Sequence, residues 1–308
     1  QFDHWANVGQ LDEPLLAKRI VDDAIDVLVD LAGHTDGNRL WVFAMKAAPI
    51  QISYLGFGYT TGLAAMDYFI GDETLLPEGV EALFSEKLVR LPRPMFCYDP
   101  MMATPDIGPL PAERNGFVTF GSLTRLIRLN DEVLTTWRDL LRAVPESRLL
   151  IDSTPFRDAE TQDFFLKRIE KLGLPVERVT LRCSKPHWPT YNDIDITLDC
   201  WPHNIGTTAV ESLWMGVPVL SRRHRPSVGR VASVFNHAVG LDDWSVETNE
   251  AFIARGVAAA RDIAGLAALR KGLRERVLTS PLADHAGFTR AFEDAVQGMV
   301  ETFNDKRG

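Results

Sequence analysis

The segment WPHNIGTTAVESLWMGVPVL (201–220) combines a small polar loop with the start of a predicted helix. Gly206 leaves room for a ligand to approach the backbone, and Thr207 and Thr208 add hydroxyl groups beside the unpaired amides that begin any helix. Those amides carry about half a positive charge, so the arrangement suits a phosphate group. Glu211 follows one turn later, where its carboxylate can accept hydrogen bonds from the vicinal hydroxyl groups of a ribose. The alternative is an ordinary helix start, with Thr207 as the capping residue and Glu211 as a favourable first-turn acid.

Two further patterns have the residue types of metal sites. Asp193 and Asp195 form a D-x-D pair, but they flank the entry to a predicted strand, where acidic turn residues are common. The second set loosely has the spacing of a zinc site and consists of Cys183, His187, Cys200 and His203. Its members lie at the ends of predicted buried strands, where cysteine usually serves as a small hydrophobic residue. We therefore expect no metal site.

Strands and helices are predicted to alternate along the chain. After a helical pattern at 15–24, the first half contains a helix at 39–46, a glycine-rich loop at 57–62, and strands at 25–31, 50–56 and 66–71. The second half contains helices at 131–143 and 158–172, and strands at 116–122, 147–152, 178–183, 194–199 and 217–221. This rhythm predicts right-handed crossovers and parallel sheets, hence an α/β chain with two Rossmann-like lobes. Ligands bind such sheets at the carboxyl ends of the strands, which is where the loop before Thr207 is expected.

A proline-rich stretch from Pro92 to Arg114 has no amphipathic period and separates the two halves. We expect an N-terminal lobe at 1–105, a linker at 106–115 and a C-terminal lobe at 116–285. The segment 286–308 is amphipathic and is predicted to form a helix that packs back on the first lobe.

Composition limits the classes of function. The chain has 308 residues, 45% of them hydrophobic, and its 33 basic and 42 acidic side chains give a net charge of −9. This excess of acid argues against general binding of nucleic acids or anionic membranes, and no run of about 18 apolar residues could span a bilayer. Three scattered cysteines form no disulfide framework, which fits a reducing compartment. We expect a cytoplasmic enzyme with neither nucleic-acid nor membrane partners.

Six blocks of sequence occur in a specific order between residues 25 and 220: IDVLVDLAGHTDGNR, APIQISYLGFGYTTGLAAMDYFIGD, SEKLVRLP, FVTFGS, YNDIDITLD and GTTAVESLWMGVPVL. In this order they resemble the catalytic region of protein O-GlcNAc transferases and SPINDLY proteins, bacterial relatives included. The resemblance implies a GT-B glycosyltransferase fold with two Rossmann-like lobes and a nucleotide sugar bound mainly by the second. It also implies that no metal cofactor is needed, because helix dipoles and basic side chains stabilise the leaving group.

The resemblance assigns donor-binding roles in the second half of the chain. Thr207 and Thr208 match a threonine pair that binds the diphosphate, and Gly206 stands where many bacterial relatives also have glycine. Glu211 matches an acid that holds the ribose, and His187 matches a histidine near the nucleotide base.

Basic residues and the first half of the chain receive further roles from the resemblance. Arg128 replaces a lysine that contacts the diphosphate, and Arg125 lies close to it in the sequence. Arg230 ends the basic run SRRHRPSVGR and matches an arginine expected to add positive field to the phosphate pocket, although a solvated loop is the simpler interpretation. Gly56 matches a glycine that lines the sugar pocket, and His34 faces the same cleft in bacterial relatives.

In the family, a first strand, a histidine-bearing loop linked to the catalytic base, and tetratricopeptide repeats precede the part that begins here at Gln1. We therefore expect this chain to be a fragment, with its catalytic base upstream of Gln1. The alternative is a degenerate relative that binds a nucleotide sugar without turning it over.

The sequence thus predicts an inverting transfer of GlcNAc from UDP-GlcNAc to Ser or Thr of a protein acceptor, without a cofactor. Two alternatives stay open. One is the same fold acting on GDP-fucose or UDP-glucose, and the other is a non-catalytic module that binds a nucleotide sugar.

Overall fold

A computed structural model of the chain describes residues 3–100 and 102–306. The chain divides into two compact units: unit 1 comprises residues 1–96 and 286–308, and unit 2 comprises residues 97–285. The division after Phe96 falls within the proline-rich stretch between the two predicted halves. Within the described residues, no helix has both the length and the apolar character that crossing a membrane requires.

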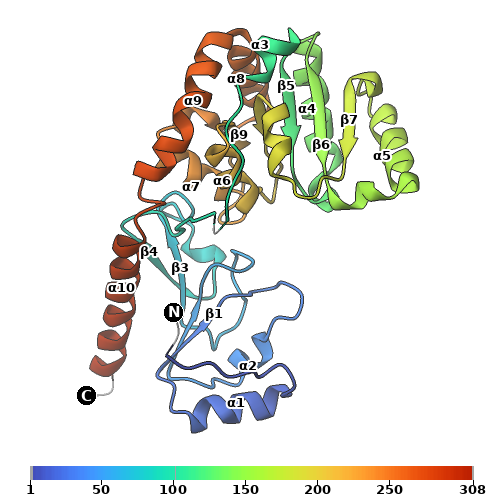
Figure 1. Cartoon of the computed structure of the whole chain (residues 1–308). Helices are drawn as coiled ribbons and strands as arrows, with labels where there is room; N and C mark the ends of the chain where they lie inside the picture. The colour runs from blue at the N-terminus through green and yellow to red at the C-terminus, as the bar shows by residue number, and fades with distance from the viewer. Residues whose placement is uncertain (1–2, 101, 307–308) are drawn as a thin grey trace. The chain divides into compact units, whose positions relative to one another are not determined.

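Unit 1 is built on a four-stranded parallel sheet in the order β1-β2-β3-β4 (Figure 1). Its strands are β1 (Val27–Asp30), β2 (Ile50–Ser53), β3 (Tyr68–Asp72) and β4 (Lys87–Leu91). Two helices, α1 (Glu13–Asp22) and α2 (Leu40–Ala44), pack against each other. The side chain of Asp12 caps α1 by accepting a hydrogen bond from the amide of Leu15. The central strands β2 and β3 are buried along their whole length, so the core of unit 1 lies on them.

The last helix, α10 (His285–Asp305), belongs to unit 1 from Ala286 onward. Its rings of Phe288 and Phe292 lie 6.3 and 5.3 Å from the ring of Tyr54, which directly follows β2. Tyr54 is held in turn by its hydroxyl group, which donates to the carbonyl oxygen of Met95 at 2.7 Å. Residues from the end of the sequence therefore complete the packing of a unit that begins at its start.

Unit 2 contains a six-stranded parallel sheet in the order β10-β9-β8-β5-β6-β7. Its strands are β5 (Thr119–Ser122), β6 (Arg148–Asp152), β7 (Val179–Arg182), β8 (Ile196–Leu198), β9 (Val219–Arg222) and β10 (Ser245–Val246). The chain moves outward from β5 to β7 and then returns to β8 on the other side of β5. Strand order therefore reverses between β5 and β8, which is the point where doubly wound sheets bind ligands.

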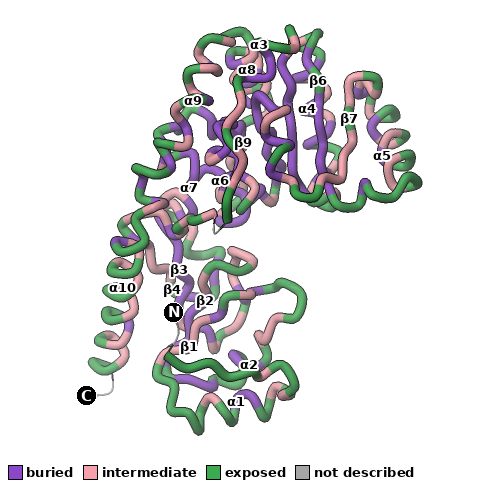
Figure 2. The backbone as a smooth tube through the Cα atoms, viewed as in Figure 1, coloured by how far each residue is buried: buried purple, intermediate pink, exposed green. Residues whose placement is uncertain are grey.

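Seven helices are described in unit 2: α3 (Pro111–Asn115), α4 (Asp131–Ala143), α5 (Ala159–Lys171), α6 (Thr207–Trp214), α7 (Val231–Ala238), α8 (Asn249–Arg261) and α9 (Ile263–Thr279). Helix α4 packs against α8, and α6 packs against α9. Figure 2 shows that β5 and β6 are enclosed, whereas the outer faces of the helices are exposed. The sheet and its carboxyl-end loops are therefore supported by a continuous packed core.

Most predicted elements have observed counterparts. The helix expected at 131–143 is α4, and the strand expected at 147–152 is β6. Strands β4 and β10 were not predicted. Strand β4 carries Lys87 and Arg90 on a partly exposed edge, and β10 has only two residues, so neither shows a clear apolar period.

Candidate functional site

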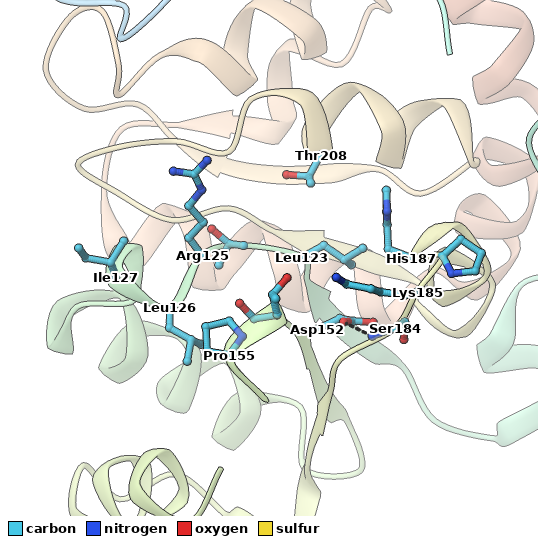
Figure 3. A pocket seen from close by; sticks show the side chains of 14 residues that line it. Leu123, Arg125, Leu126, Ile127, Asp152, Pro155, Ser184, Lys185, His187 and Thr208 are labelled. Atoms are coloured by element: carbon cyan, nitrogen blue, oxygen red, sulfur yellow. Dashed lines mark hydrogen bonds between the residues drawn. The ribbon is translucent and has the colours of Figure 1, made fainter. Parts of the chain in front are cut away.

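A cavity of about 560 Å³ opens in unit 2 at the carboxyl ends of β5, β6 and β7 (Figure 3). Its walls are residues 123–127 after β5, 152–155 at the end of β6, 184–187 after β7, and Thr208 in the first turn of α6. The cavity therefore lies beside the reversal of strand order, and four separate loops or helix ends supply its polar groups.

Thr208 in the first turn of α6 lines this cavity, whereas Gly206 and Thr207 are not part of its wall. Gly206 is the N-cap residue, with φ −103° and ψ −99°, and no described side chain caps the helix. The alternative in which Thr207 caps α6 is therefore wrong. The position that a Cβ of Gly206 would take has no atom within 4 Å. The first amides of α6 and the hydroxyl group of Thr208 are thus arranged as an anion would need them.

The loop before α6 is held by Asp199, which directly follows β8. Its Oδ1 accepts hydrogen bonds from the amides of Cys200 and Ile205, both at 2.7 Å, and its Oδ2 accepts from the hydroxyl group of Ser221 at 2.6 Å. Burial raises the pKa of Asp199 to about 7. The sequence reasoning missed this residue, although an acid directly after a buried strand was the available signal.

The two arginines after β5 have different surroundings. Arg128 donates through Nη1 to the carbonyl oxygen of Asn204 at 2.9 Å, so it supports the same loop as Asp199, and its burial lowers its pKa. Arg125 is exposed and lies on the cavity wall (Figure 3). Arg125 therefore presents its charge to the cavity, while the charge of Arg128 is turned to the loop before α6.

The residues predicted to contact base and ribose lie together. His187 Nε2 is 2.9 Å from Glu211 Oε2, and the hydroxyl group of Tyr191 donates to the same oxygen at 3.1 Å. The hydrogen bond to Glu211 raises the pKa of His187. The imidazole is stacked on Trp188 with 5.2 Å between the ring centroids. His187 lines the cavity, whereas Glu211 is buried behind it and is not part of the wall.

Two charged residues of the wall were missed by the sequence reasoning. Lys185 follows β7 and brings a second positive charge to the cavity, and Asp152 ends β6 (Figure 3). Arg230, which the sequence reasoning did select, is the N-cap residue of α7 and is not part of the wall. Burial lowers the pKa of Arg230, and its charged neighbours are Glu247 and Arg223. A role of Arg230 in phosphate binding stays a prediction.

In unit 1, the structure brings together the loops that carry His34 and Gly56. His34 Nε2 is 3.2 Å from the carbonyl oxygen of Thr60, and its ring stands edge-on to Phe57. A Cβ on Gly56 would lie 2.4 Å from the carbonyl carbon of Ala32, so only glycine allows this close approach of two backbones. A role of His34 and Gly56 in sugar or acceptor binding stays a prediction.

The two metal-like patterns are occupied by other interactions. Asp195 accepts hydrogen bonds from the amides of Ala112 and Thr119 at 2.8 and 2.7 Å, while Asp193 pairs with Arg182 at 2.6 Å. Cys200 is buried and donates to the carbonyl oxygen of His203 at 3.2 Å. Across residues 3–100 and 102–306, no group of three or more His, Cys, Asp and Glu side chains could hold a metal ion.

The arrangement of uncapped helix start, basic cavity and doubly wound sheet agrees with a family comparison. Residues 2–108 and 109–292 match the model of glycosyl transferase family 41. The chain belongs to this family. The resemblance inferred from the six sequence blocks is therefore confirmed.

Two curated relatives resemble this chain over nearly its whole length. A protein from Solanum lycopersicum, named probable UDP-N-acetylglucosamine–peptide N-acetylglucosaminyltransferase SPINDLY, is 35% identical over 305 residues, which cover 98% of this chain and 33% of that protein. A UDP-N-acetylglucosamine–peptide N-acetylglucosaminyltransferase from Caenorhabditis elegans is 21% identical over 421 residues, covering 98% of this chain and 36% of that protein. The chain thus spans about a third of the length of the curated relatives it matches.

A solved structure supports the fold of this family 41 chain. A mutant O-GlcNAc transferase from Thermobaculum terrenum matches with a TM-score of 0.90 and 36% identity, covering 99% of this chain and 59% of that one. The prediction of a GT-B fold with two parallel-sheet α/β lobes is therefore confirmed.

Proposed function

We propose that this family 41 chain forms the core of an inverting glycosyltransferase, which moves GlcNAc from UDP-GlcNAc to Ser or Thr hydroxyl groups of proteins. The observation that carries the proposal is the start of α6, which is uncapped and adjoins a cavity at the carboxyl ends of the strands. The names of the relatives from Solanum lycopersicum and Caenorhabditis elegans support the choice of donor sugar and peptide acceptor.

In this proposal, unit 2 binds the donor. The diphosphate contacts the first amides of α6 and the hydroxyl groups of Thr207 and Thr208, with Arg125 and Lys185 supplying positive charge. The uracil base of the nucleotide lies beside His187. Both protein hydrogen bonds to Glu211 use Oε2, so its Oε1 can accept a hydrogen bond from the ribose when the side chains adjust.

The chemistry follows from the charge that develops on the leaving group. The acceptor hydroxyl oxygen bonds to the anomeric carbon, the bond from that carbon to the diphosphate breaks, and the diphosphate keeps the electron pair while the hydroxyl proton passes to a base. Amides and cations already aimed at the diphosphate stabilise this charge without reorganising, and that lowers the barrier. The proposal requires no metal cofactor. We assign the sugar and acceptor side, including His34 and Gly56, to unit 1, and propose a cytoplasmic location, which three free cysteines favour.

Donor binding is tested by thermal shift of the full chain with UDP, GDP, UDP-GlcNAc, UDP-glucose and GDP-fucose. A ligand present at 100 times its Kd stabilises the native state by about 2.7 kcal/mol, so the preferred nucleotide gives the largest rise in Tm. We expect UDP and UDP-GlcNAc to exceed the guanine nucleotides. A larger rise with GDP-fucose would instead reassign the donor.

Transfer is tested by mass spectrometry of acceptor proteins after incubation with UDP-GlcNAc and the full-length gene product. Addition of one hexosamine residue to Ser or Thr is the expected result. Binding of UDP-GlcNAc without modification of the protein itself or of lysate proteins would identify a binding module and refute the transferase.

A further inference from the structure

Asp152 lies in the cavity wall but has none of the binding roles described above. It is only 7% exposed, although it is the last residue of β6 and adjoins an open cavity. One carboxylate oxygen accepts a hydrogen bond from the amide of Ser184 at 3.0 Å (Figure 3). The other accepts from the hydroxyl group of Thr190 at 2.8 Å. Both partners lie beyond the end of the neighbouring strand, β7.

Further contacts tie the same segment to the end of β6. Thr190 is 2% exposed, and its Oγ1 lies 3.0 Å from Ser184 Oγ. The amide of Ser153 donates to the carbonyl oxygen of Arg182 at 2.9 Å. The segment 182–190 is therefore attached to the end of β6 at three residues: Arg182, Ser184 and Thr190. Removal of the Asp152 carboxylate would release two of these attachments at once.

The attached segment carries two side chains that the proposed function uses. Lys185 and His187 both lie on the cavity wall, and His187 bridges to Glu211 on α6. Hydrogen bonds thus join Ser184 to the end of β6 and His187 to α6, so the segment 184–187 connects these two elements along one side of the cavity. The charge of Asp152 also favours the protonated form of His187, adding to the larger effect of the hydrogen bond that Glu211 accepts from it.

We propose that Asp152 is a positioning residue, which holds the segment 184–187 so that Lys185 and His187 can bind the nucleotide of the donor. The identity of the ligand in this inference rests on the proposed function, whereas the anchoring of the segment to β6 does not. A buried acid that served stability alone would affect folding without a specific effect on nucleotide affinity.

The test compares Kd for UDP, measured by calorimetry, between the full chain and its variants Asp152→Asn and Thr190→Val. In Asp152→Asn the amide oxygen can still accept from Ser184, and the NH₂ group can donate to Thr190 Oγ1 when that hydroxyl group donates to Ser184 Oγ, so the change removes the charge and weakens both hydrogen bonds. Thr190→Val removes the hydroxyl group from the other partner. We expect Kd to rise about tenfold in Asp152→Asn, because both hydrogen bonds lose their charged acceptor, and less in Thr190→Val.

The matched control is Asp158→Asn in the same unit. Asp158 caps α5 by accepting from the amide of Thr161 at 2.7 Å, and it is not part of the cavity wall. Asp158→Asn therefore tests the loss of a structural carboxylate, and we expect Kd for UDP to stay within twofold of the wild-type value.

Two further readouts separate positioning from general stability. In a Lys185→Ala background, Asp152→Asn should raise Kd less than it does alone, because both changes remove the same contact to the nucleotide. Without ligand, the amide of Ser184, which donates to Asp152, should exchange hydrogen faster in Asp152→Asn while the amides of β6 do not.

Each outcome decides the proposal. An unchanged Kd in folded Asp152→Asn, or an undiminished effect in the Lys185→Ala background, overturns the positioning role. If Asp152→Asn does not fold, Thr190→Val decides by the same comparison. If the wild-type chain does not bind UDP, the proposed function fails, and unchanged exchange at the amide of Ser184 would reject the anchor as well.

Discussion

Replacing Asp199 by asparagine tests whether a buried carboxyl group holds the loop before α6. The pKa of this group is 3.8 in the absence of burial and is raised to about 7 in the folded chain. The folded state therefore binds the proton more tightly than the unfolded state. The contribution of this group to the free energy of unfolding is fully present below pH 3.8 and is lost as pH rises to about 7. The loss corresponds to at most about 4 kcal/mol in the free energy of unfolding above pH 7.

Asparagine fits the three hydrogen bonds of Asp199 without carrying a charge. Its Oδ1 can accept from the amides of Cys200 and Ile205, as Asp199 Oδ1 does, and its NH₂ can donate to Ser221 Oγ. We expect Asp199→Asn to match the wild type near pH 4 and to exceed it at pH 8 by about 1 to 4 kcal/mol, the lower values applying if Arg128 offsets much of the charge. Asp199→Ala leaves two buried amides unpaired and should lose about 2 to 6 kcal/mol near pH 4, with a smaller difference from the wild type at pH 8, where the wild type has itself lost the stability of the neutral carboxyl group.

The assay is urea denaturation of the full chain between pH 4 and pH 8, followed by tryptophan fluorescence. Trp137 and Trp201 are fully buried in unit 2, so their emission reports unfolding of the unit that contains Asp199. Parallel curves of stability against pH for the wild type and Asp199→Asn would refute the reasoning, as would a lower stability of Asp199→Asn at pH 8.

Three further predictions concern the site and unit 1. Thr208→Val should raise Kd for UDP about tenfold with little change in Tm, because it removes one donor to phosphate; calorimetry measures the first and a thermal melt the second. Glu211→Gln should lower the pKa of His187 in an NMR titration. Because that pKa is raised by Glu211, the stability lost in Glu211→Gln should be about 1 kcal/mol or less at pH 5.5 and smaller still at pH 8.5. Gly56→Ala should destabilise unit 1 by about 1 to 3 kcal/mol through overpacking, whereas Gly298→Ala in α10, with open space around it, should be neutral or stabilising in the same denaturation assay.

Much of the fold could be predicted because local signals and tertiary packing agree. Helix α4 has an Asn130 cap at its start and a buried face that includes Val133 and Trp137, so its limits are encoded locally. The uncapped start of α6 was one of two alternatives that the sequence left open, because Thr207 could also have been the capping residue.

The missing parts depended on contacts between residues far apart in the sequence. Asp152 and Asp199 each look like an ordinary turn acid after a strand, and only the folded sheet shows that each is buried and hydrogen-bonded to a neighbouring loop. Arg125 and Arg128 lie within one short turn, so the sequence could not show which of them faces the cavity. Glu86, which holds the glycine-rich loop by accepting from the amide of Thr61 at 2.7 Å, was hidden for the same reason.

The division of unit 1 between two distant parts of the chain has a consequence for its biosynthesis. A ribosome releases residues 286–308 only after all of unit 2 has emerged, so α10 can pack on the ring of Tyr54 only after unit 2 has been made. Unit 2 is contiguous and can fold as soon as it is made. We therefore expect the two units to mature in the opposite order to their appearance in the nascent polypeptide.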